Sequence, residues 1–235
     1  MGLGFLPFYG FDIYQIILLL AAMIVGGWAQ TKVKRTFEYY SRVPSSRRFS
    51  ASEAAGMILR QNGIGDVSLA KSGGGSLSDA YDPRKKTIQL SGDVYYSNSI
   101  AALAIAAHEA GHAIQHSRRY FFLSLRHFLV PVTKFSSYLS FPLILLGIFM
   151  SYPLLTQIGV YAFLVTVIFQ LVTLPVEFDA SKKALHALLE TGAISQEETG
   201  GVKRMLNAAA LTYVAATIVA FLTLVRLLLL TRRRN

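Results

Sequence analysis

The sequence predicts a mainly α-helical protein that crosses a membrane about four times, with a small α+β region after the first span. Of its 235 residues, 53% are hydrophobic and only 15% are charged, and the mean hydropathy is +0.43. This excess of apolar residues is too large for an ordinary soluble domain. The net charge of +10 comes from basic residues beside long apolar runs, a pattern typical of cytoplasmic loops between spans. No nucleic-acid-binding motif accompanies this charge, so we expect no nucleic-acid partner.

Residues 12–29 form the first predicted transmembrane helix, with Trp28 placed as an interfacial anchor. A cleaved signal peptide is the alternative interpretation. Signal peptides carry their basic residues before the apolar run, whereas here Lys32, Lys34 and Arg35 follow it. We therefore expect an uncleaved anchor whose N-terminus lies outside the cell.

Residues 30–132 make up the α+β region, which begins with a basic stretch. Ser50 and Glu53 form a capping box that predicts a helix directly after them. The sequence Asp82-Pro83-Arg84-Lys85 is a turn signal between two apolar runs, which predicts a β-hairpin. The expected elements are a helix at 51–61, a strand at 67–71, a glycine-rich turn at 72–76 and hairpin strands at 77–81 and 87–90.

Residues 133–175 form a predicted transmembrane hairpin. The stretch 135–174 carries no charge and is long enough for two spans of about 20 residues joined by a tight turn. We expect Pro175 to close this hairpin.

Residues 176–206 are polar again and are expected to hold a helix that begins at Val176 and stops near Gly192. Ser195 and Glu198 form a second capping box. Residues 207–231 are the last predicted span, which ends in a cluster of arginines.

A motif of the form H-E-x-x-H lies at His108-Glu109-Ala110-Gly111-His112, in a helix predicted from about Asn98 to Ser117 with Ser97 or Asn98 as its N-cap. Histidines four residues apart share one helix face, so both can bind one metal ion. Glu109 can then take a proton from a metal-bound water. The chain has no cysteine, so the ligands must be His, Asp or Glu, and one Zn²⁺ per chain suits this set. The alternative is an ordinary helix that carries two histidines by chance.

A catalytic zinc site needs a third protein ligand, and Glu177 is the predicted one. The metzincin pattern is excluded because positions 115 and 118 hold Gln and Arg where that pattern has Gly and His. No Asp or Glu occurs between Glu109 and Glu177, and the intervening hairpin returns the chain to the same side of the membrane. We also expect Glu177 to open a helix, where the N-terminal dipole would stabilise its charge. An ordinary acid at a helix start is the alternative.

Three other histidines are weaker candidates for the site. His116 lies one turn beyond His112, but the drift of about 40° for each four-residue step places it at the rim. We expect His127 to lie near the membrane interface, and His186 to be structural because it lies on the helix face opposite Glu177.

Six segments carry a resemblance to a known family: 81–85, 90–91, 93–95, 99–102, 107–115 and 174–178. In these segments the chain resembles the YugP-like neutral zinc metallopeptidases, a family of bacterial membrane proteases related to the gluzincins. In the gluzincin membrane proteases the third ligand is a Glu in the pattern Glu-aromatic-x-Ala-Asp, and the final Asp can orient a zinc-bound His. Here Glu177-Phe178-Asp179-Ala180 fits, but Ser181 takes the last position and offers a weaker hydrogen bond.

The resemblance implies a zincin-like membrane metalloendopeptidase with His108, His112 and Glu177 as metal ligands and Glu109 as the general base. Its substrate would be a peptide or protein, including membrane proteins, and the free edge of the hairpin could hold an extended peptide. An ordinary hairpin without that role is an equally open interpretation. The alternatives are an intramembrane-cleaving protease and a non-catalytic membrane scaffold that binds metal. The basic loops place the site on the cytoplasmic side of the bacterial cell membrane, although the terminal arginines oppose this.

Overall fold

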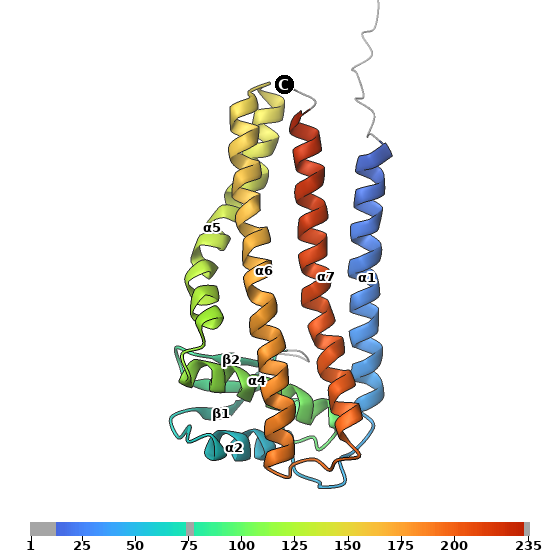
Figure 1. The fold of residues 1–235 in the computed structure, drawn as a ribbon, viewed down its shortest axis with the longest axis vertical. Coiled ribbons are helices and arrows are strands. Elements are labelled where there is room, and N and C mark those ends of the chain that lie inside the picture. The colour runs from blue at the N-terminus through green and yellow to red at the C-terminus, as the bar shows by residue number, and fades with distance from the viewer. Residues whose placement is uncertain (1–12, 74–77, 233–235) are drawn as a thin grey trace, which may run out of the picture.

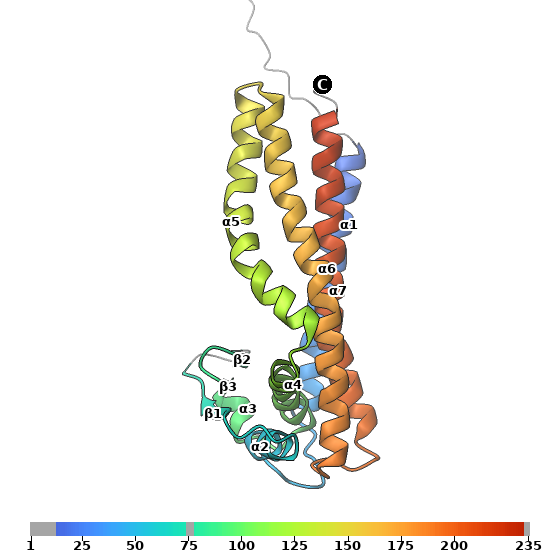
Figure 2. The same ribbon diagram turned by 60° about the vertical axis from the view of Figure 1, so that its left-hand side comes forward.

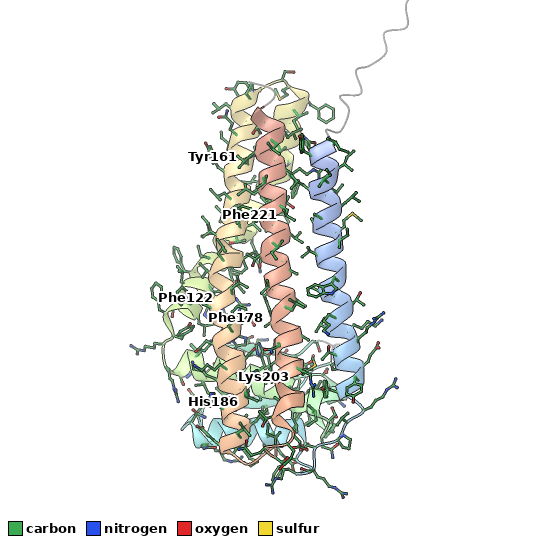
Figure 3. All side chains as sticks on the ribbon, turned by 45° about the vertical axis from the view of Figure 1, so that its right-hand side comes forward. Phe122, Tyr161, Phe178, His186, Lys203 and Phe221 are labelled. Atoms are coloured by element: carbon green, nitrogen blue, oxygen red, sulfur yellow. The ribbon has the colours of Figure 1, made fainter. Side chains whose placement is uncertain are left out.

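The computed structural model describes residues 13–73 and 78–232, and four long helices dominate the described chain. They are α1 (Ile13–Tyr40), α5 (Phe121–Phe149), α6 (Pro153–Glu190) and α7 (Thr199–Arg232), and each is long and apolar enough to cross a membrane. These four helices run along the long axis of the molecule, and the shorter helices and the sheet lie at one end (Figure 1). Large apolar side chains project outward, among them Tyr161 and Phe221, which are 66% and 56% exposed (Figure 3). Such a surface suits lipid, and it confirms the predicted fold class.

Parts of four predicted features lie outside the described residues. They are Asp12 of the first span, residues 74–76 of the glycine-rich turn, Leu77 of the first hairpin strand, and the arginines at 233 and 234.

The helices α5 and α6 form a helical hairpin where one was predicted, but both helices extend beyond the predicted bounds 133–175. Ser151, at φ +50°, lies in the tight turn between them. Small residues let the two helices approach closely. A Cβ on Gly159 would lie only 2.8 Å from the Ser140 carbonyl oxygen. The Ser140 hydroxyl in turn donates a 2.8 Å hydrogen bond to the Gly159 carbonyl. Close packing at small residues is how transmembrane helices associate without a hydrophobic driving force.

The expected break at Pro175 is wrong. The helix α6 continues through Pro175 to Glu190, and α5 likewise contains Pro131 and Pro142. Proline removes one backbone donor, but membrane helices tolerate it because neighbouring groups satisfy the freed carbonyl. Glu177 therefore lies far inside α6 and does not open a helix.

The α+β region contains the predicted helix and hairpin. Ser50 and Glu53 form both arms of the capping box of α2 (Ala51–Gln61). The strands β2 (Ala80–Asp82) and β3 (Thr87–Leu90) pair antiparallel, while β1 (Ser68–Lys71) pairs parallel with β3, in the order β1-β3-β2. A short helix, α3 (Gly92–Tyr95), was not predicted.

The motif helix α4 (Ile100–Ser117) runs across the base of the bundle, horizontal in Figure 1 and end-on in Figure 2. Its N-cap is Ser99, which accepts a hydrogen bond from the Ala102 N–H, and not the predicted Ser97 or Asn98. Ser97 instead donates to the Ser99 hydroxyl, and the Asn98 carbonyl accepts from Ser45. The alanines of α4 are almost fully buried in protein, so this apolar helix is a core element and not a span.

One glycine sets the distance between α4 and α6. A Cβ on Gly111, between the two motif histidines, would lie 2.5 Å from the backbone carbonyl of Ala180. Neither backbone can yield without moving its helix, so the motif helix can approach α6 only with glycine at this position.

We expect Gly111→Ala to lower the free energy of unfolding by about 1–3 kcal/mol through overpacking. Thermal unfolding of the purified protein in detergent measures this change. Gly27→Ala is the matched control, because its Cβ would meet no atom within 4 Å and the substitution favours a helix. Equal melting temperatures for Gly111→Ala and the wild type would contradict the close contact.

Candidate metal centre

Two helices distant in sequence bring the predicted ligands together. On α4, His108 and His112 lie one turn apart, with ring centroids 4.7 Å from each other. On α6, Oε2 of Glu177 lies 3.1 Å from Nε2 of His108 and 3.6 Å from Nε2 of His112. One ligand atom from each of the three residues lies within 4.8 Å of the others, so the group could hold a metal ion.

The Glu177 side chain is only 2% exposed, and cationic or polar groups surround it. Its second oxygen, Oε1, accepts a 2.8 Å hydrogen bond from the guanidinium of Arg126 on α5. Tyr213 on α7 also interacts with the carboxylate. The predicted stabilisation by a helix N-terminus is wrong, because Glu177 lies 24 residues after the start of α6. The arginine provides the positive charge that the dipole was expected to supply.

A buried glutamine fixes the orientation of His112. The amide nitrogen of Gln115 donates to the Val176 carbonyl and to Asp179, each at 2.8 Å. Its amide oxygen therefore accepts, and the group that donates to it at 3.0 Å is Nδ1–H of His112. In the neutral ring this leaves the lone pair on Nε2 of His112, which lies 3.6 Å from Oε2 of Glu177.

Two acceptors that face each other at 3.6 Å repel unless a metal ion lies between them or the ring takes up a second proton. The nitrogen and oxygen donors also match the ligands that Zn²⁺ prefers. The residues present therefore fit a metal ion.

Ser181 occupies the position where the resemblance implied an aspartate. Its hydroxyl lies 3.2 Å from Nδ1 of His108, while Nε2 of the same ring faces Glu177. A serine one turn after Glu177 is therefore placed to orient His108 as the expected carboxylate would.

Glu109 lies beside the group and contacts the small sheet. Its Oε2 accepts a 2.8 Å hydrogen bond from the backbone N–H of Tyr81 on β2. Since the strand order is β1-β3-β2, this N–H lies on the strand at the edge of the sheet. Burial raises the pKa of the Glu109 carboxyl.

The remaining histidines are not part of the group. Nδ1 of His116 lies 2.7 Å from the Tyr81 hydroxyl, and its ring packs edge-on against His127 at 6.5 Å. His186 is exposed near the far end of α6 (Figure 3). Sequence reasoning missed the roles of Gln115 and Arg126 in the site. The spacing of Gln115, three residues after His112, could have indicated its contact, whereas nothing local to Arg126 points to Glu177.

We expect Gln115→Met to weaken Zn²⁺ binding by about tenfold or more, because His112 loses the acceptor that fixes its tautomer. Competition with a chromophoric chelator measures the affinity of the purified protein. His116→Gln is the control and should bind Zn²⁺ as the wild type does. Unchanged affinity in Gln115→Met would contradict the orienting role of Gln115.

Residues 15–232 match the family described as "Putative neutral zinc metallopeptidase". The chain is also 43% identical over 215 residues to "Putative membrane protease YugP" of Bacillus subtilis (strain 168), which covers 92% of this chain and 95% of that protein. No solved structure matches the chain. Since the family match spans nearly the whole sequence, including both helices of the His-His-Glu group, this chain belongs to the neutral zinc metallopeptidase family.

Proposed function

We propose that this protein is a membrane-bound zinc endopeptidase that holds one Zn²⁺ through His108, His112 and Glu177. The observation that carries the proposal is the convergence of these three side chains beside Glu109, which is the arrangement that zinc-assisted hydrolysis needs. The family and the YugP relative support a peptidase that acts at a membrane.

Bound zinc would supply a water of lowered pKa and polarise the scissile carbonyl. Glu109 would accept a proton from that water and deliver it to the leaving amine. The Tyr81 N–H holds Oε2 of Glu109 and leaves Oε1 for this transfer. Ser181 and Gln115 would hold the two imidazoles in position.

The strand β2 is placed to hold an extended peptide substrate. It lies at the edge of the sheet, and its Tyr81 N–H already reaches the catalytic glutamate. The Tyr81 N–H is held by Glu109, so a peptide added to this edge would pair with the Tyr81 carbonyl and pass beside the ligand group. This favours a sequence-tolerant endopeptidase for unfolded or extended segments.

Two features favour cleavage at the membrane surface over cleavage within the bilayer. Glu177 lies 24 residues beyond Pro153, which is about 36 Å along α6, whereas the hydrocarbon core is about 30 Å thick. The motif helix α4 is buried in protein and is not among the candidate spans.

The number of ligands argues against a non-catalytic scaffold. A purely structural zinc site would have four protein ligands, whereas the group found among the described residues has three.

The matched experiment compares wild type, Glu109→Gln and Glu177→Ala for metal content and peptidase activity. We expect Glu109→Gln to keep about one zinc per chain and to lose activity by about 10²-fold or more, because the base is removed and the ligands remain. Glu177→Ala should lose most of the zinc. Full zinc in Glu177→Ala would refute the ligand assignment, and a metal-free active wild type would refute the proposed mechanism.

We place the site on the cytoplasmic side, because the end of the bundle that carries α2, α4 and the sheet also carries the basic stretches 31–48, 118–134 and 182–204. The natural absence of cysteine allows single-cysteine labelling with a membrane-impermeant maleimide. Tyr152→Cys, in the exposed turn at the opposite end, should react in intact cells. Arg60→Cys on α2 should react only after permeabilisation, and the reverse result would place the site outside.

A further inference from the structure

A groove of about 630 Å³ lies between α1 and α7, at the end of the bundle that carries the metal centre. The two helices run side by side in both views (Figures 1 and 2). Trp28, Lys32, Arg35 and Tyr39 line it from α1 at spacings of four, three and four residues, so they form one stripe on that helix. Arg204 and Leu211 are among the residues that line it from α7. None of the residues of the metal centre takes part.

The groove is strongly basic. Lys32, Arg35 and Arg204 line it, and no Asp or Glu is among the lining residues. Within the described part of the chain none of these three cations forms an ion pair, although the Arg204 guanidinium lies over the Tyr40 ring at 5.9 Å. The neighbouring Lys34, by contrast, faces Glu38. Glu38 lies in the adjoining hollow with Arg35, but its ion pair is with Lys34. Three cations that form no ion pair make a site for an anion.

The other end of the groove is apolar. Trp28 is 58% exposed and lies one turn along α1 from Lys32, toward the apolar part of that helix. Ala208 and Leu211 line the facing part of α7, where the last apolar run begins. Cations beside an exposed tryptophan at the start of a span mark the membrane interface. The groove thus joins a charged half, on the side away from the spans, to an apolar half at the membrane interface.

We propose that this groove binds one anionic phospholipid, with its phosphate among Lys32, Arg35 and Arg204 and an acyl chain along Trp28 and Leu211. An anion that was not amphiphilic would use only the charged half. A basic pocket between transmembrane helices at the cytoplasmic leaflet has the charge and depth that a lipid phosphate requires. This lipid site shares no residue with the metal centre, and lipid binding there does not require peptidase activity.

Trp28 is the only tryptophan in the chain, so its fluorescence reports on this groove alone. The full-length protein is reconstituted in phosphatidylcholine vesicles in which a small fixed fraction of the lipid is brominated phosphatidylglycerol or, separately, brominated phosphatidylcholine. Bromine quenches only a tryptophan that it contacts. We expect brominated phosphatidylglycerol to occupy the site at least about tenfold more strongly, as three interfacial cations predict.

The variant with Lys32→Gln, Arg35→Gln and Arg204→Gln should quench equally with both brominated lipids. The matched control replaces three exposed lysines at the same end that do not line the groove, Lys34, Lys182 and Lys203, with Gln and should keep the wild-type preference. Circular dichroism and thermal unfolding verify that both variants fold. The single variant Arg204→Gln, which should lose part of the preference, replaces the triple variant if that one does not fold.

Equal quenching of the wild type by both lipids would overturn the proposal, whatever the variants do. Loss of the preference in the control variant as well would show general surface attraction and would also overturn it. Two further arms test other occupants. If added glycerol 3-phosphate abolishes the preference, the site binds a soluble phosphate and the lipid proposal is wrong. If the wild type is a dimer and only the groove variant is a monomer, the groove binds a second copy of this chain and the lipid proposal is also wrong.

Discussion

The rest of the structure depends on one buried carboxylate. Glu177 is 2% exposed in the middle of a long, largely apolar helix, and burying an unpaired charge there would be very costly. Its partners come from all the helices around it: His108 and His112 from α4, Arg126 from α5 and Tyr213 from α7. The glycine at position 111 lets α4 approach closely enough for this. The requirement to satisfy one acid thus fixes how three spans and the motif helix meet.

The prediction of Glu177 as a ligand rested on several observations in the sequence, and the structure contradicts one of them. The interval without Asp or Glu after Glu109 left few candidates, and the even number of crossings placed Glu177 on the side of His108 and His112, which it contacts in the structure. The expected helix start failed because the local effect of Pro175 was weighed without the tertiary contacts of the next turns. Val176 and Ala180 are fully buried and contact α4 through Gln115 and Gly111, and this packing outweighs one missing hydrogen bond, so α6 continues.

Local signals predicted local structure well and tertiary partners poorly. The Ser50–Glu53 capping box and the Asp82–Lys85 turn predicted α2 and the hairpin, because both depend on neighbouring residues. The parallel pairing of β1 with β3 joins two segments that are far apart in the sequence, and so does the contact of Arg126 with Glu177. No periodicity in the sequence encodes either one. For the same reason the orienting role of Gln115 appears only once α4 and α6 are placed together.

The metal centre and the basic groove lie at the same end of the molecule because of the lengths of α6 and α7. The helix α6 is longer than a bilayer core needs, so its polar end extends past the membrane surface and carries Glu177 there. The helix α7 starts beyond the same surface, with Arg204 at the groove and Tyr213 beside Glu177 about 14 Å further along it. An anionic headgroup held at Arg204 would fix the depth of α7 in the bilayer. Because α7 is one continuous helix that packs against α6, the same contact would hold the catalytic end of the bundle at the membrane surface, where extended segments of membrane proteins emerge from the lipid.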